Sequence, residues 1–171
     1  AGANTVIIPA AGTVTRPGTG HVIGNLQKNV AVSAGTISRS FEIGDAAGYS
    51  PVQVDFTSVA TAGNLVAKAT ALEHPDVANS LIDSTQNVNR YWTLTNTGIV
   101  FSDYSATATY ASGDIDSGAD PVTFGIGKAD ACDGALQNCT WTYPTVVGTP
   151  TTTSAQVSGM TGFSHFVVGR K

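Results

Sequence analysis

Charged side chains are scarce in this sequence. They make up 12% of its 171 residues, about half of the ~25% that is usual in a globular domain. Only eight residues are Lys or Arg, and the net charge is −4. This argues against a nucleic-acid-binding protein, because such proteins gain affinity by neutralising phosphates. The hydrophobic fraction of 42% is too high for a disordered chain.

Long hydrophobic runs are also missing. No stretch of ~18 apolar residues is present, so we expect no membrane-spanning segment. The basic and apolar regions of a signal peptide are absent, and the chain opens with Ala1-Gly2-Ala3, small residues that are typical of a signal-peptidase cut. We therefore expect a mature, secreted protein.

Cysteine is rare, with only Cys132 and Cys139 present. Two thiols cannot complete a structural zinc site, and their spacing is not that of a C-x-x-C redox motif. We predict a local disulfide between them, which contributes about 2–3 kcal/mol through loop closure and suits an oxidising, extracellular location.

Alternation of apolar and polar residues dominates the chain. Segments such as 52–56, 91–95 and 104–110 show it clearly, and Gly, Asn, Asp and Pro separate such segments at short intervals. About ten short strands with this spacing predict an all-β fold, an immunoglobulin-like two-sheet β-sandwich. Residues 76–86 are expected to form a polar connection with at most one helical turn. We divide the chain into an N-terminal strand region, residues 1–15, and a sandwich domain, residues 16–171.

Two sequence elements carry a resemblance to a known group of proteins. They are Val88-Asn89-Arg90-Tyr91-Trp92 and the terminal run Phe163-Ser164-His165-Phe166-Val167-Val168-Gly169. With these elements the chain resembles the β-sandwich modules that close large secreted bacterial surface proteins. The resemblance implies an extracellular, non-enzymatic module at the cell surface. The chain departs from the pattern in its basic ending, Gly169-Arg170-Lys171.

The sequence offers little for catalysis. His21, His74 and His165 are scattered along the chain, and no Gly-x-Ser-x-Gly elbow is present, so nothing indicates a nucleophile with its base. We expect that the protein is not an enzyme.

An acidic loop is the candidate metal site. Asp114, Asp116 and Asp120 occupy positions one, three and seven of a short loop and could offer oxygen ligands to Ca²⁺. Asp is also an ordinary turn former. We expect no resident cofactor, with calcium at this loop as the alternative left open.

Aromatic residues offer a candidate glycan platform. Arg90 and Trp92 share one face of a strand and Tyr91 takes the other, a pattern typical of a core tryptophan with an arginine stem packed along it. Trp141 and Tyr143 alternate in the same manner, and we expect them to be exposed and to form the better platform, if there is one.

The N-terminal strand is the candidate assembly element. Val6, Ile7 and Ile8 are strongly strand-forming and uncharged, and Pro9 ends the run because it lacks an N–H. Burying three such side chains in a neighbouring subunit contributes roughly 5–8 kcal/mol before ordering costs. We therefore predict an extracellular structural subunit that binds copies of itself in a filament or layer. The alternatives are a carbohydrate-binding or adhesive module and a phage or capsid-like shell protein.

Overall fold

The regular secondary structure of the protein is almost all β-strand. The computed structural model describes residues 2–16 and 18–171. Ala1, part of the expected chain start, and Pro17 therefore lie outside the described residues. The strands are β1 (Gly2–Ile8), β2 (Val22–Val30), β3 (Ile37–Phe41), β4 (Ile43–Gly44), β5 (Val52–Phe56), β6 (Val59–Thr61), β7 (Gly63–Ala71), β8 (Asn87–Thr97), β9 (Val100–Phe101), β10 (Tyr104–Thr109), β11 (Phe124–Asp130), β12 (Thr140–Thr142), β13 (Ser154–Met160) and β14 (His165–Arg170). Short 3₁₀ turns lie at η1 (Val77–Asn79), η2 (Ser112–Asp114) and η3 (Pro121–Thr123). Within the described ranges no helix is long and apolar enough to cross a membrane.

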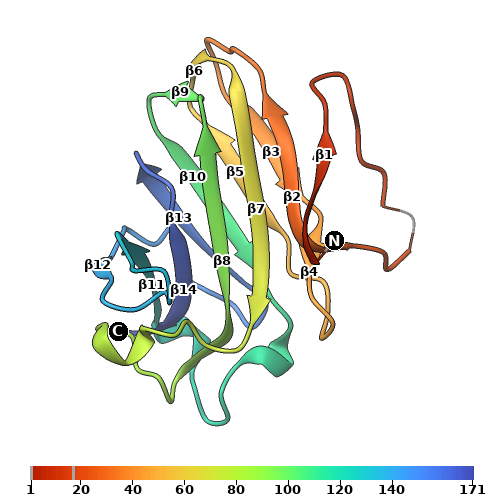
Figure 1. The fold of residues 1–171 in the computed structure, drawn as a ribbon. Coiled ribbons are helices and arrows are strands. Elements are labelled where there is room, and N and C mark those ends of the chain that lie inside the picture. Colours follow the sequence, from red (N-terminus) through yellow and green to blue (C-terminus); the bar gives the residue numbers. More distant parts are fainter. Residues whose placement is uncertain (1, 17) are drawn as a thin grey trace.

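Two sheets form the body of the molecule (Figure 1). The larger sheet has the order β1-β2-β7-β8-β14-β11-β12, with β4 pairing beside β2, and the smaller sheet has the order β13-β10-β5-β3. Strands β6 and β9 form a separate short ribbon. Neighbouring strands are antiparallel except that β1 and β4 each run parallel to β2. The predicted all-β sandwich is thereby confirmed.

The core lies between the two sheets. Alternate side chains of each strand point inward, and the large sheet contributes Leu26, Leu65 and Trp92 where the small sheet contributes Phe56 and Tyr104. The strand predicted at residues 52–56 has the expected alternating burial. Burial of so many β-branched and aromatic side chains supplies the main driving force for folding.

Strands β3 and β4 are separated by the single residue Glu42. The chain from Phe41 to Ile43 leaves the small sheet and enters the large one, so the ladder breaks at Glu42. There the carbonyl of Glu42 accepts a hydrogen bond from the N–H of Val22 instead of continuing the pairing of β3 with β5.

A smaller second core covers the outer face of the large sheet. The connection between β7 and β8 places Val77 and Ile82 against Tyr91 and Val167. Tyr91 alternates with Trp92, which faces the main core, so the two rings lie on opposite faces of β8 as predicted. The connection has one short turn, η1, as expected for this polar segment.

Candidate functional site

The N-terminal residues form an arm at one end of the large sheet. We call β1 and the turn after it, residues 2–14, the arm. In the parallel register Val6 lies opposite Leu26 and Ile8 lies opposite Lys28. Figure 1 shows the arm in red as the outermost part of this sheet, with a connection that swings away from the body before it returns to β2. Among the described residues, β1 has one neighbour in the sheet order, β2. The arm is therefore attached through one strand-to-strand contact.

The side chains of the arm are only partly buried. Ile7 is 61% exposed and Val6 is 37% exposed, whereas Ile8 packs on the rim of the main core. The strand ends at Ile8, before Pro9, as predicted, and the carbonyl of Pro9 accepts the N–H of Gly12 in a tight turn. At this degree of burial the three apolar side chains contribute about 3–5 kcal/mol before ordering costs. This is less than the value expected for full burial.

The sheet edges differ in how they are protected. β1 carries no charged side chain, and in the described part of the chain its outer edge pairs with no strand. At the small sheet's edge strand β3, by contrast, Lys28 Nζ donates to the carbonyl of Ser40 and Arg39 donates to that of Ser38. At the opposite edge, Val146 bridges to β13. Natural proteins block exposed edges in such ways to prevent strand addition, and β1 has no such protection.

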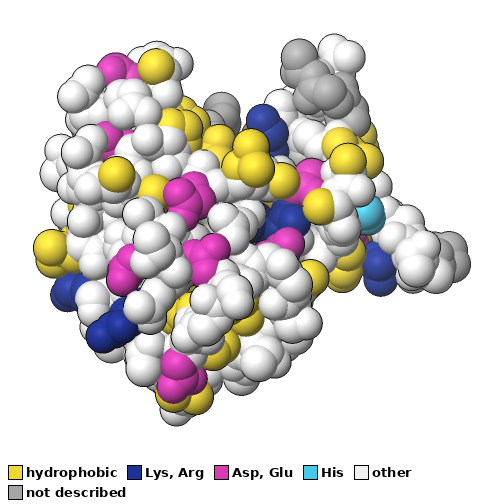
Figure 2. Space-filling model, turned by 90° about the horizontal axis from the view of Figure 1, so that it is seen from below, with side chains coloured by type: hydrophobic (Ala, Val, Ile, Leu, Met, Phe, Trp, Pro, Cys, Tyr) yellow, Lys and Arg dark blue, Asp and Glu magenta, His cyan; other side chains and the backbone are white. Residues whose placement is uncertain are grey.

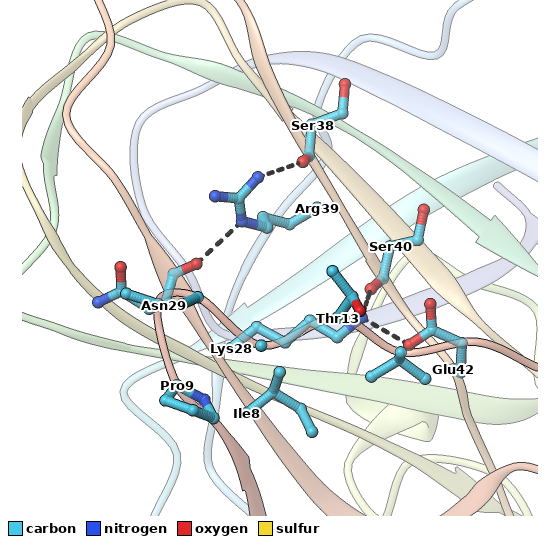
Figure 3. Close-up of a pocket in the computed structure, with 13 residues that line it drawn as sticks. Ile8, Pro9, Thr13, Lys28, Asn29, Ser38, Arg39, Ser40 and Glu42 are labelled. Carbon is cyan, nitrogen blue, oxygen red and sulfur yellow. Dashed lines mark hydrogen bonds and ion pairs between the residues drawn. The ribbon is translucent and has the colours of Figure 1, made fainter.

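A polar cavity lies beneath the arm. Its volume is about 380 Å³, and its walls come from the arm (residues 8–14) on one side and from β2, β3 and Glu42 on the other. Figure 3 shows Lys28 of β2 and Arg39 of β3, strands of different sheets, in this region. Nothing in the sequence pattern identifies this cavity, since it arises where an arm from one end of the chain meets side chains from two different sheets.

The predicted disulfide between Cys132 and Cys139 is present. The loop it closes is held by the buried carboxylate of Asp76, which accepts hydrogen bonds from the backbone N–H groups of Asn138 and Cys139. It also accepts one from the side chain of Asn79 and one from the indole N–H of Trp141. These bonds, that from Asn79 foremost, lower the pKa of Asp76 below its ordinary value.

The three aspartates of the candidate calcium loop have separate protein partners. Asp114 forms an ion pair with the buried Arg90. Asp116 accepts the N–H of Asn87 and the side-chain amide of Asn89, and Asp120 caps the turn η3 through the N–H of Val122.

No joint ligand set forms from these aspartates. Among the described residues, their oxygens are not gathered into a group that could hold a metal ion. On the face seen in Figure 2 the acidic side chains are dispersed over the surface. The geometry gives these carboxylates a structural role, and calcium at this loop stays an untested alternative.

The candidate glycan platform is not the exposed pair that was expected. Trp141 and Tyr143 are half-buried against the second core. The indole N–H of Trp141 is donated to Asp76, and the hydroxyl of Tyr143 accepts the N–H of Leu81. The strand β12 ends at Thr142, before Tyr143, although both rings pack against the same core. Alternation could not show that the connection between β7 and β8 covers this face.

Two histidines meet beside the disulfide. Ligand atoms of His74, His165 and Cys132 all lie within 4.8 Å of one another. The sulfur of Cys132 is already bonded to Cys139. His74 Nδ1 accepts the N–H of Asp76, so in the neutral ring Nε2 carries the proton and has no free lone pair. The residues present therefore do not make a metal site.

The comparisons with known proteins return no relative. No protein-family model, no curated protein and no solved structure matches this chain. The resemblance to bacterial surface modules therefore remains a prediction from the two sequence elements that suggested it.

Proposed function

We propose that this protein is an extracellular structural subunit that assembles into a filament or layer by donating its arm to a neighbouring subunit. The observation that carries the proposal is the attachment of the arm. In the described part of the chain this uncharged strand, at one end of the large sheet, pairs with no strand besides β2, and a long connection joins it to the rest of the chain. The disulfide and the scarcity of charge support an extracellular location.

Exchange of the arm replaces each contact within a chain by the same contact between two chains. Val6 and Ile8 of one subunit would meet Leu26 and Lys28 of the next in the register that they have within one chain. The arm can therefore dock in its own chain or in a neighbouring subunit. The ratio of the two states depends on the protein concentration relative to the effective concentration of the tethered arm, which is typically millimolar. Because the donated arm and the accepting edge lie on different subunits, the contact is heterologous, and it extends into a filament unless the rotation closes a ring.

A pair of cysteines across the β1–β2 contact tests this directly. Ile7 and Gln27 are register partners, so a double variant Ile7→Cys/Gln27→Cys forms its new disulfide within one chain if the arm stays in place and between chains if it is exchanged. We expect a ladder of covalent oligomers on non-reducing gels after assembly at high concentration.

Two matched variants complete the design. Gln27 and Val66 are partners inside the sheet, so Gln27→Cys/Val66→Cys should still assemble but should run only as monomers on the same non-reducing denaturing gels. Deletion of residues 1–10 should give folded monomers that do not assemble. Filaments that persist after the deletion, or an Ile7→Cys/Gln27→Cys variant whose filaments dissolve to monomers in denaturant without reductant, would contradict arm donation.

The carbohydrate-binding alternative loses its predicted platform, because Trp141 and Tyr143 serve packing and hydrogen bonding. A glycan-array signal that disappears in Trp141→Ala, with the variant still folded, would restore it. Electron microscopy of the purified protein distinguishes a filament from the shell-like assembly of the third alternative.

A further inference from the structure

The cavity beneath the arm has the features of a ligand site. It has a volume of about 380 Å³, which falls within the ~300–1,000 Å³ range of small-molecule pockets. Its arm side is apolar, with Ile8, Pro9 and Val14, and the opposite side carries the backbone carbonyls of Ser38 and Ser40 together with charged groups.

The charges around the cavity do not balance. Lys28 Nζ is paired with the carboxylate of Glu42 at 2.6 Å, so these two groups neutralise each other. Arg39 belongs to none of the ion pairs found among the described residues. The wall therefore carries one uncompensated positive charge in a protein whose net charge is negative.

Arg39 is fixed in place and still has hydrogen-bond capacity. Its Nε donates to the carbonyl of Asn29 at 2.9 Å and its Nη1 donates to the carbonyl of Ser38 at 2.8 Å (Figure 3). A guanidinium has five N–H donors, so Nη2 and one N–H of Nη1 remain. Carbonyl groups hold the planar group still but do not neutralise it. A fixed guanidinium with free donors is suited to a carboxylate, which it binds through two parallel N–H···O bonds.

We propose that this cavity binds a carboxylate-bearing sugar, a hexuronate, with the carboxylate on Arg39. The sugar hydroxyls would meet the backbone carbonyls of Ser38 and Ser40 and the polar backbone of the arm, and the apolar face of the ring would lie against Ile8 and Val14. A singly charged ligand matches the single uncompensated charge of the wall.

The site also joins the arm to the body. A ligand in the cavity touches residues 8–14 as well as β2 and β3, so it stabilises the docked arm by the free energy of its binding. Stabilisation of an arm that comes from a neighbouring subunit rests on the proposed function. Binding itself does not, because the cavity is complete within one chain.

Titration calorimetry of the full chain with glucuronate, and with glucose as the uncharged control, tests the site. We expect saturable binding of glucuronate that is at least about tenfold tighter than that of glucose, since a charge-assisted pair is lost with the carboxylate. Arg39→Gln should weaken glucuronate binding about tenfold or more. Lys68→Gln removes one positive charge from β7, outside the cavity lining, and should leave the affinity within about twofold.

Amide chemical shifts of the wild-type protein give a second readout that does not depend on the Arg39→Gln variant folding. Glucuronate should shift the resonances of residues 8–14 and 38–42 and leave those of the second core, around Trp141, unchanged. The proposal fails if glucuronate does not bind, if glucose or inorganic phosphate binds equally well, or if the shifts lie elsewhere. Failure of filament assembly leaves these measurements interpretable, and failure of glucuronate binding leaves the cysteine cross-link assay unaffected.

Discussion

Acidification should destabilise this protein through His74. Its side chain is 1% exposed and is enclosed by the rings of Tyr91, Trp141 and His165 at centroid distances of 5.0, 5.4 and 5.3 Å. Burial and, to a smaller extent, the neighbouring His165 lower the pKa of His74 from 6.5 to about 4, while Asp76 opposes the shift. A proton on Nδ1 would also displace the N–H of Asp76, which donates to that atom at 3.2 Å.

The sign and size of the effect follow from linkage. Because the pKa of His74 is lower in the folded state than its ordinary value, the unfolded chain binds the proton more tightly. The stabilisation due to His74 is complete above pH ~6.5 and is lost as the pH falls toward ~4. With these two pKa values the loss at pH 4.5 is about 2.5 kcal/mol, a large part of the ~5–15 kcal/mol typical of a domain.

Urea unfolding at pH 7.0 and pH 4.5 measures this loss in the wild type and in His74→Phe. The variant keeps a ring in the pocket but cannot be protonated, so it should lose about 2.5 kcal/mol less than the wild type between the two pH values. The variant also lacks the Nδ1 acceptor for the backbone N–H of Asp76. This lowers its free energy of unfolding at both pH values, so the effect cancels when the two pH values are compared. The ordinary pKa of Asp76 is 3.8 and the folded value is lower, so this carboxylate contributes little in the chosen window. Equal losses in the two proteins would refute the reasoning.

Three further predictions concern stability. Replacing Cys132 and Cys139 together by serine should lower the free energy of unfolding by about 2–3 kcal/mol, measured by urea denaturation, and a loss below ~1 kcal/mol would show that the hydrogen bonds to Asp76 hold the loop alone. Calcium should leave the melting temperature of the wild type unchanged, because the carboxylates of the acidic loop are engaged by the protein; a rise in the wild type that is absent in Asp116→Ala would establish a site. Gly169→Ala should destabilise the protein by more than ~2 kcal/mol, because the added Cβ would lie 2.5 Å from the Cβ of Asn87. A melting temperature equal to that of the wild type would show that β8 shifts to accommodate the methyl group.

The sequence pattern predicts local features of this protein better than contacts between distant segments. Alternation located strands such as β5 and separated the faces of Tyr91 and Trp92, because side-chain direction in a strand has a period of two. It could not show which outer face is covered, so Trp141 was expected at the surface. Nor could it predict that His74 lies beside His165, or Arg39 beside the arm, because contacts between segments distant in the sequence depend on strand order. The disulfide was predictable because both cysteines belong to one short loop.

The parallel direction of β1 has a consequence for the dimensions of any polymer. Within one chain, a parallel neighbour forces residues 9–21 to travel back along the strands before β2 begins. A donated arm does not need this return path, and the same thirteen residues become a spacer between subunits. Fully extended they span about 43–47 Å. The length of this spacer limits the distance from the start of β2 to the accepting edge of the next subunit, and so limits the axial rise per subunit of a filament. Shortening the spacer should reduce this axial rise before it abolishes assembly.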